Sequence, residues 1–322
     1  GIPLLVGRDV IHGFKTVLPI PLGQAAAWNP ELVQQGARMA ALEAAASGVN
    51  WTFAPMIDIA RDPRWGRIAE SFGEDSHLAA VLGAAAIRGF QGDGLSRPGA
   101  IAACAKHFVG YGASEGGRDY GYVGIPEVDL RNVHMPPFRA AADAGVATFM
   151  AAFSDVNGVP ASGNRFLTRT VLRDEWRFPG FVVSDWDSIV DMIVHGLVPK
   201  DREAAPAALS AGVDMEMVST TYRDHLPGLL AAKRVDPRLL EDAVRNVLRV
   251  KMQLGLFERT VTNPAVYPGV ASAANLALAR ELATQSLVLL QNRNGVLPLA
   301  SKSLRSLAVI GPLADDAYEQ LG

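Results

Sequence analysis

The sequence predicts an α/β fold in which parallel strands alternate with helices and close into a TIM-like (β/α)8 barrel. The first observation is that short apolar segments alternate with helical segments about six times. The second is that nearly every predicted strand ends in a polar side chain, at Asp9, Asp58, Lys106-His107, Asp155, Asp185 and Glu216. The carboxyl ends of barrel strands converge on one rim, whereas an open sheet spreads them along an edge, so we expect a barrel.

The composition of the 322 residues, 49% hydrophobic and 20% charged, is that of a folded chain with a sizeable core. The net charge of −3 argues against nucleic acid or an anionic membrane as the main partner. The single cysteine, Cys104, excludes a disulfide framework or a cysteine-based zinc site within one chain. No apolar run reaches the length of a membrane span. Residues 1–6 resemble the interior of a domain rather than a signal peptide, so we expect a preceding segment and a barrel incomplete at its amino-terminal end.

The first third of the chain predicts two strands and two long helices. A short buried strand over residues 4–6 leads to Asp9, and an apolar turn over residues 16–22 is broken by two prolines. Asn29 caps a helix that has Pro30 at its first position and continues to residue 46. Residues 52–59 predict a strand that ends in Asp58. A charged loop over residues 61–75 and an alanine-rich helix over residues 76–91 follow.

The middle third predicts three more strands. Residues 101–105 form a strand that ends in Lys106-His107, and a loop rich in glycine and tyrosine follows over residues 110–124. Residues 128–144 are helical with a break at Pro136, and residues 147–153 form the next strand. A helix over residues 167–176 then leads to an apolar, β-branched strand that begins at residue 181.

The last third predicts helices over residues 189–195, 203–211 and 222–232, with a strand over residues 213–217. Asp236 caps a long amphipathic helix that reaches residue 254. Beyond it comes a linker with two prolines, and then residues 273–290, which predict a helix or a helix running into a strand. A new buried strand is predicted at residues 307–312. We therefore assign residues 1–258 to the barrel, 259–303 to an interdomain linker and helix, and 304–322 to the start of a truncated second domain.

The strand at residue 181 has the most informative end of all, because it changes abruptly from apolar residues to Ser184-Asp185-Trp186. A buried strand that ends in a carboxylate beside an indole packs poorly, but it suits a catalytic site at the rim of a barrel. The alternative is that Asp185 caps the following helix, since Asp is an ordinary cap residue.

The polar residues at the other strand ends are suited to holding a sugar, which is polar at its edge and apolar on its face. Asp9 can accept hydrogen bonds from neighbouring hydroxyls, and the guanidinium of Arg67 offers a planar set of donors. Trp186 offers a flat apolar face. We expect Lys106 and Arg67 to lower the pKa of Asp185 and so to keep it ionised as a nucleophile. The alternative for this loop is a structural ion-pair cluster of Arg67 with Glu70, Glu74 and Asp75.

The sequence supports two other catalytic chemistries less well than it supports a sugar-binding site. The run Gly112-Ala113-Ser114-Glu115-Gly116 matches the nucleophile elbow of serine hydrolases, but it lies within a loop and not between a strand and a helix. Lys106 could form a Schiff base in an aldolase-type barrel, yet the adjacent His107 leaves it without an apolar desolvating neighbour. The sequence contains no HExxH, Walker or dinucleotide-binding motif, and its histidines form no recognisable metal cluster.

Seven motifs, in order along the chain, resemble family 3 glycoside hydrolases, the β-glucosidase and β-xylosidase group. They are Asp9-Val10-Ile11-His12-Gly13, Ala54-Pro55-Met56-Ile57-Asp58, Asp62-Pro63-Arg64-Trp65-Gly66-Arg67, Phe72-Gly73-Glu74-Asp75, Lys106-His107-Phe108, Val183-Ser184-Asp185-Trp186 and Val309-Ile310-Gly311-Pro312. The resemblance covers essentially the whole chain. It implies a TIM-like barrel followed by an α/β sandwich domain, of which this chain holds the first strand.

The resemblance also implies the roles of the rim residues. Asp185 is the expected nucleophile, and Asp9, Arg67, Lys106 and His107 are expected to grip the sugar where cleavage occurs. Trp186 is expected to flank the leaving group, and Phe153 stands where some members carry a tyrosine, which removes a hydrogen bond to the sugar. No metal or organic cofactor is implied.

The expected function is that of a retaining β-glycosidase, most of all a β-glucosidase, acting on small oligosaccharides or β-glucosides. In the β-glucosidase branch the acid/base glutamate comes from the second domain, so we expect it outside this chain. In the N-acetylhexosaminidase branch an Asp-Ser-His motif serves instead, but here that loop reads Glu115-Gly116-Gly117-Arg118-Asp119-Tyr120. If a proton donor lies inside the chain, Glu216, Asp187 and Glu115 are the candidates.

Several alternatives stay open. One is a carbohydrate-binding or regulatory module without turnover, and others are β-xylosidase or N-acetylhexosaminidase specificity. The resemblance favours a periplasmic or secreted location, with the cytoplasm as the alternative. It also makes the remainder of the second domain the expected partner of this barrel.

Overall fold

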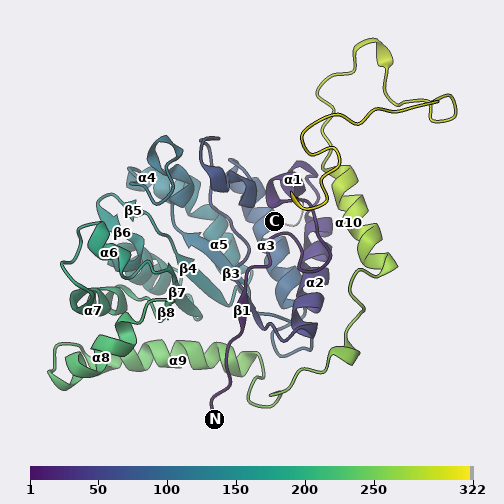
Figure 1. Cartoon of the computed structure of the whole chain (residues 1–322). Helices are drawn as coiled ribbons and strands as arrows, with labels where there is room; N and C mark the ends of the chain where they lie inside the picture. The colour runs from purple at the N-terminus through teal and green to yellow at the C-terminus, as the bar shows by residue number, and fades with distance from the viewer. Residues whose placement is uncertain (320–322) are drawn as a thin grey trace.

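The computed structural model describes residues 1–319, in which parallel strands are flanked by helices (Figure 1). The parallel strands are β1 (Gly7–Arg8), β2 (Trp51–Thr52), β3 (Cys104–Phe108), β4 (Thr148–Ala151), β7 (Phe181–Trp186) and β8 (Met215–Met217). Strands β3, β4, β7 and β8 form one sheet in that order, and β1 pairs with β2. Single parallel bridges from Trp51 to Ala102 and from Met56 to Lys106 connect the two groups. The carboxyl ends of all six strands therefore point the same way.

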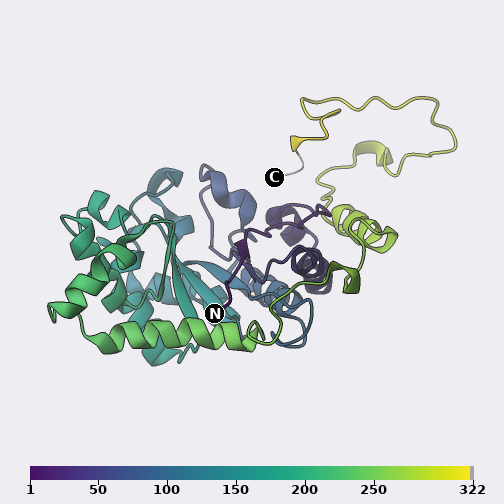
Figure 2. The same ribbon diagram turned by 60° about the horizontal axis from the view of Figure 1, so that its bottom comes forward.

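The strand order follows the chain order, as in folds built from repeated β-α units. The α/β class is thus as predicted. Within residues 1–319, no strand pairing joins β8 back to β1, so the closure of the sheet into a barrel stays a prediction. Helix α9 (Pro237–Gln253) lies below the sheet in Figure 1 and comes to the front in Figure 2. Its Lys251 donates a hydrogen bond from Nζ to the carbonyl oxygen of Pro3 at 2.8 Å.

Helices α2 (Pro30–Ala46) and α3 (Ser76–Gln91) have the predicted bounds because their start signals are local. The Asn29 side chain accepts a hydrogen bond from the backbone of Leu32. The two helices pack closely. A Cβ at Gly89 would lie 2.4 Å from the carbonyl oxygen of Gln34, so only glycine permits this approach. The other helices are α1 (Pro21–Ala26), α4 (Glu127–Asp129), α5 (Pro136–Asp143), α6 (Asp191–Val194), α7 (Asp201–Ala211), α8 (Thr221–Ala231) and α10 (Ala273–Gln285).

A cluster of buried aromatic rings packs helix α5 against the sheet. The rings of Phe108 and Phe138 have their centroids 5.4 Å apart, and those of Phe149 and Phe178 are 4.7 Å apart, both edge to face. Phe108, Phe138 and Phe149 are completely buried. Each such side chain contributes about 1.5–3 kcal/mol through burial. This core holds β3 and β4 in place beneath the rim.

Several predicted strands differ from those observed. The pairing near the amino terminus involves Gly7–Arg8 and not residues 4–6. In the segment 52–59, continuous pairing ends at Thr52 and a single bridge follows at Met56, because Pro55 has no backbone N–H to donate. Asp155 is not at the end of a parallel strand. It lies in β5 (Asp155–Val156), which forms an antiparallel hairpin with β6 (Val159–Pro160).

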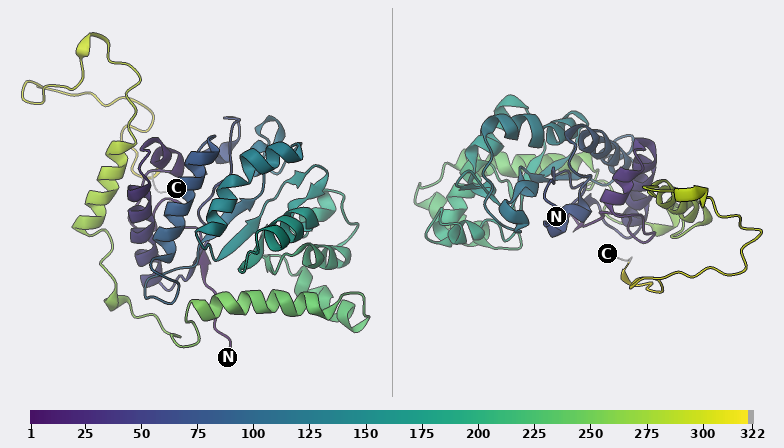
Figure 3. Two further views of the ribbon diagram at one scale, coloured as in Figure 1. Left: turned by 180° about the vertical axis from the view of Figure 1, so that it is seen from behind. Right: turned by 90° about the horizontal axis from the view of Figure 1, so that it is seen from above.

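Helix α10 packs against α2, and the segment after it leaves the body of the fold (Figure 3). Glu43, a buried carboxylate on α2, accepts a hydrogen bond from the side-chain amide of Asn275 at 2.8 Å and so ties α10 to α2. The predicted strand at residues 307–312 does not form. Leu307, Val309 and Ile310 are 68%, 70% and 90% exposed. A strand is held by hydrogen bonds to a neighbouring strand, and among residues 1–319 none pairs with this segment. The proposed division into three segments stays a prediction.

Candidate active site

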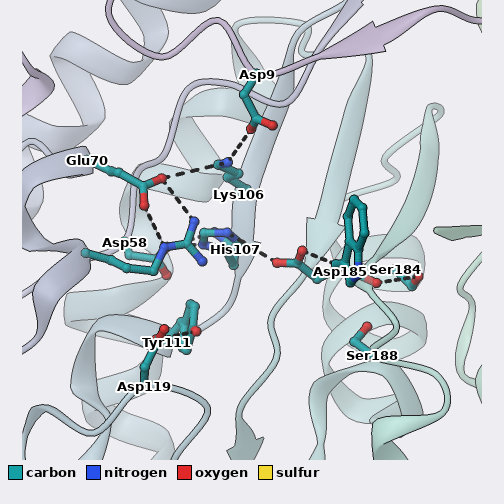
Figure 4. A network of polar contacts seen from close by, with 12 residues as sticks. Asp9, Asp58, Glu70, Lys106, His107, Tyr111, Asp119, Ser184, Asp185 and Ser188 are labelled. Carbon is teal, nitrogen blue, oxygen red and sulfur yellow. Dashed lines mark hydrogen bonds and ion pairs between the residues drawn. The ribbon is translucent and has the colours of Figure 1, made fainter. Parts of the chain in front are cut away.

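The carboxyl ends of β1, β3 and β7 bring four predicted site residues together (Figure 4). Asp9 follows β1, Lys106 and His107 belong to β3, and Asp185 belongs to β7. Parallel strands that end on one side place their terminal side chains in a common space, which is why Asp9 and Lys106 can form a hydrogen bond although they are 97 positions apart. The ammonium group of Lys106 donates to Asp9 Oδ1 at 3.0 Å and lies 3.9 Å from Glu70 Oε2. Its side chain is only 5% exposed, so the ammonium group is held by carboxylates inside the site.

Asp185 is buried at the rim, with 7% exposure. Its Oδ1 accepts a hydrogen bond from the backbone N–H of Trp186 at 2.7 Å. Its Oδ2 is buried without a hydrogen-bond partner and lies 3.3 Å from Nε2 of His107. Helix α6 begins at Asp191, and no side chain caps its start, so the helix-cap alternative for Asp185 is excluded. This carboxylate oxygen therefore keeps lone pairs that no protein hydrogen bond engages.

Burial raises the pKa of Asp185 to about 6, although the Trp186 N–H, Lys106 and Arg67 all act to lower it. The expectation that the two cations would lower the pKa is therefore wrong in its net sign. It had the direction of their effect right, but it left out the loss of solvation, which is the larger contribution at this site. At neutral pH the carboxylate is still mostly ionised.

His107 is completely buried and lies between two carboxylates. Asp58 Oδ2 accepts hydrogen bonds from the backbone N–H of His107 at 2.9 Å and pairs with ring atom Nδ1 at 2.8 Å. Burial, together with the charges of Arg67 and Lys106, holds the pKa of His107 well below its usual value, so the imidazole is neutral. Burial also raises the pKa of Asp58 to about 7. The sequence pointed to Asp58 only as a strand end, and its contact with His107 was not predicted.

Arg67 is held on two sides. Its Nε and Nη2 donate to the two oxygens of Glu70 at 2.6 and 3.0 Å, and the guanidinium lies 5.5 Å from the ring centroid of Tyr111. The Tyr111 hydroxyl in turn donates to Asp119. The ion-pair alternative is therefore correct for Glu70. It does not extend to Asp75, which caps α3, or to Glu74, which is exposed. No sequence signal singled out Tyr111 or Asp119, because their contacts depend on how the loop folds.

Aromatic side chains form one wall of the site. Phe153 is buried, with its ring centroid 4.3 Å from that of Tyr120 and 6.5 Å from that of His107. It contributes no hydroxyl. Trp186 is 61% exposed at the end of β7, where its indole face is open. The exposed indole and the half-exposed Tyr120 lie at the rim, outside the buried carboxylates.

The remaining candidates have structural partners or are exposed. Glu216 accepts hydrogen bonds from the backbone N–H groups of Thr221 and Tyr222, each at 2.8 Å, and so caps α8. Ser114 lies between two short 3-10 turns and donates its hydroxyl to the Tyr111 carbonyl at 2.8 Å, so the serine-elbow reading is excluded. Glu115 is exposed and Asp187 is partly buried.

The part of the chain that spans residues 1–319 holds neither a metal-ligand cluster nor a membrane-spanning helix. No cluster of three or more histidine, cysteine, aspartate or glutamate side chains there has the arrangement needed to bind a metal ion. None of the helices in this part of the chain combines the length and the apolar character that a bilayer span requires.

Parallel strands that present a buried free carboxylate beside Lys, His and Arg form the kind of site found in glycoside hydrolases, where a carboxylate attacks a sugar held by polar side chains. The chain belongs to glycosyl hydrolase family 3, because residues 1–250 match the N-terminal domain of that family.

Three relatives illustrate this membership. A periplasmic β-glucosidase of Salmonella typhimurium is 42% identical to this chain over its whole length. The matched region is 42% of the Salmonella protein. A putative β-xylosidase of Formosa agariphila is 37% identical over 98% of the chain and 43% of its own length. The crystal structure of a β-glucosidase from Listeria innocua in complex with glucose superposes with a TM-score of 0.89 at 42% identity, over 93% of this chain and 42% of that one. A variant of the same enzyme was solved with laminaribiose. The chain thus spans less than half the length of these relatives.

Proposed function

We propose that this chain carries the nucleophile and the sugar-binding residues of a retaining β-glycosidase, with Asp185 as the nucleophile. The observation that carries this proposal is the buried Oδ2 of Asp185, which has no hydrogen-bond partner at the centre of the rim. Asp9, Arg67 and Lys106 surround it with the donors and acceptors that sugar hydroxyls require. The barrel fold inferred from the strand order belongs to the same proposal.

The reaction proceeds by double displacement. Asp185 Oδ2 attacks the anomeric carbon, a covalent glycosyl ester forms, and the bond to the leaving oxygen breaks as that oxygen takes up a proton. Water then attacks the same carbon, gives up a proton to a base and releases the sugar with Asp185 restored as a carboxylate. The residues that bind the sugar act in both steps by holding the ring in place.

The proton donor is the part that this chain does not readily supply. Of the three candidates inside the chain, Glu216 caps α8, Glu115 is exposed and Asp187 has no contact that directs it to Asp185. We propose that the acid/base glutamate comes from a second domain, the remainder of which is the partner of this one. The 42% share of the Salmonella enzyme that this chain covers is consistent with that division.

We propose β-glucosides as the substrates, with β-xylosides as the second candidate. The glucose and laminaribiose complexes of the Listeria enzyme, at 42% identity, support a glucosyl substrate. The Formosa β-xylosidase, at 37% identity, supports the second. N-acetylhexosaminides are not favoured, because the loop at residues 115–120 lacks the expected motif. The periplasmic location of the Salmonella relative supports a periplasmic or secreted location here.

The deciding experiment is covalent trapping with a 2-fluoro glucoside that carries a dinitrophenolate leaving group. Trapping requires the nucleophile but no proton donor, since dinitrophenolate leaves without protonation. Mass spectrometry is expected to find the fluoroglucosyl group on the peptide that contains Asp185 and to find none in the Asp185→Asn variant. Glucose binding without any adduct would favour the binding-module alternative. A borohydride-trapped adduct on Lys106 would favour an aldolase, although its ion pairs with Asp9 and Glu70 oppose that chemistry.

A further inference from the structure

Three buried polar atoms without a hydrogen-bond partner in residues 1–319 belong to one line of side chains, visible in Figure 4. They are Asp58 Oδ1, His107 Nε2 and Asp185 Oδ2. Asp58 and Asp185 lie on opposite sides of the His107 ring, at 2.8 Å from Nδ1 and 3.3 Å from Nε2. Unpaired buried polar atoms are costly, so a line of three of them requires an explanation. The question is which ring nitrogen of His107 carries the hydrogen.

The contact with Asp58 answers this question. Asp58 Oδ2 accepts a hydrogen bond from the backbone N–H of His107 at 2.9 Å, and a backbone N–H can only donate. The same oxygen faces Nδ1 at 2.8 Å, so an ionised Asp58 requires the ring hydrogen to be on Nδ1. A neutral imidazole carries one N–H, and Nε2 is then a bare acceptor.

A bare Nε2 has a direct consequence for the nucleophile. Nε2 and Asp185 Oδ2 are 3.3 Å apart, and with no hydrogen between them neither can bond to the other. Both lone pairs are then left without a donor among the described side chains. If the hydrogen were on Nε2, it would be donated to Asp185 Oδ2, and the lone pair needed for attack would be engaged.

We propose that Asp58 is a positioning residue, which holds His107 in the Nδ1–H form so that Nε2 accepts a hydrogen bond from a sugar hydroxyl and the nucleophile Asp185 stays free. The last part of this inference rests on the proposed function. The substrate class that it selects is a sugar with a hydroxyl able to donate at this point. Asp58 touches neither the sugar nor the reacting atoms and acts through His107.

The first test observes the tautomer directly and needs no activity. The chain is labelled with ¹⁵N-histidine, and the ring signals of His107 are identified by their absence in a His107→Gln variant. At a pH above the Asp58 pKa of about 7, we expect a hydrogen on Nδ1 and none on Nε2. A hydrogen on Nε2 in the unmodified chain would overturn the proposal, whatever the variants show.

The second test separates the role of the acceptor from that of the charge. Asp58→Asn keeps an oxygen facing the two N–H groups, so we expect the Nδ1–H form to persist and the glycosylation rate with dinitrophenyl glucoside to stay within about threefold. Asp58→Ala removes the acceptor. We expect the hydrogen to move to Nε2 and the glycosylation rate to fall about tenfold or more. Glucose affinity should fall less than the rate does.

Glu43→Gln is the matched control, because it alters another buried carboxylate whose hydrogen bonds go to residues 15, 16, 271 and 275 and not to His107. The His107 signals should not move in this variant. An Asp58→Ala variant that retains both the Nδ1–H form and the rate would overturn the proposal. If that variant does not fold, the spectra of the unmodified chain and of Asp58→Asn still decide. If the Nδ1–H form is found but no adduct ever forms on Asp185, the proposed function fails while the role of Asp58 in setting the tautomer stands.

Discussion

Replacing Asp185 by asparagine is expected to make the protein more stable while it abolishes turnover. In the folded chain the pKa of this carboxyl lies at about 6, against an ordinary value of 3.8, because the group is buried. A raised folded-state pKa means that the folded form prefers the protonated acid. Ionisation therefore destabilises the folded chain, and asparagine is neutral at every pH. Its amide oxygen can still accept the Trp186 N–H, and its NH2 group can donate to a bare Nε2 of His107.

The magnitude follows from the pKa. One pKa unit corresponds to about 1.4 kcal/mol, so ionising Asp185 costs the folded state about 3 kcal/mol above pH 6. As the pH rises from 3.8 to about 6, the unfolding free energy of the unmodified chain falls by this amount. At higher pH the effect of Asp185 on the unfolding free energy stays constant. The unfolding free energy of the Asp185→Asn variant should therefore exceed that of the unmodified chain by up to about 3 kcal/mol at neutral pH, and hardly at all near pH 4.

The assay is urea unfolding of both proteins from about pH 4 to pH 8, with the difference in unfolding free energy plotted against pH. Other carboxyl groups affect both proteins alike, so the difference isolates Asp185. A variant that is less stable than the unmodified chain at neutral pH would contradict this prediction. So would a difference that does not change with pH. Either result would mean that the carboxylate is stabilised by contacts and not strained by burial.

Three further predictions concern activity and glucose binding. The glycosylation rate with dinitrophenyl glucoside should depend on ionised Asp185 and fall about tenfold between pH 7 and pH 5, since the pKa is about 6; a flat profile would contradict this. Arg67→Ala and Lys106→Ala should each weaken glucose binding by about 1.5–3 kcal/mol in calorimetry without unfolding the chain, whereas Arg64→Ala, which removes an exposed ion pair, should leave binding unchanged. A large drop in Tm with unchanged affinity would instead make Arg67 and Lys106 structural. The chain alone should react with dinitrophenyl glucoside but barely hydrolyse cellobiose, with azide restoring turnover of the ester, because protonating a sugar leaving group contributes about 10²–10⁴-fold. Ordinary cellobiose hydrolysis unaffected by azide would place a proton donor inside the chain.

The helices were the most predictable part of the fold, because their signals are local. Asn29 and Pro30 define the start of α2 within a few residues, and the apolar period defines its buried face. Strands were predicted less well. Residues 307–312 have the composition of a buried strand but form none, because a strand exists only when another strand pairs with it.

The polar strand ends show the same limit. Asp9, Lys106, His107 and Asp185 gather as predicted, whereas Asp155 lies in a hairpin and Glu216 caps α8. In the sequence all of these positions look alike, since a carboxylate after an apolar run serves equally well as a cap, a turn residue or a catalytic group.

The alternation of strands and helices, the ends of the main helices and the ordered motifs that resemble family 3 can all be read from the sequence. Each of these depends on residues that are close together in the chain. The structure was needed to show that Asp185 is buried with one oxygen free of hydrogen bonds, and that burial raises its pKa by more than the neighbouring cations lower it. It also decided that Asp58 and Asp185 face the two nitrogens of His107. These properties cannot be read from the sequence because the solvation and pairing of a side chain depend on residues that lie far apart in the chain and meet only when the strands are assembled.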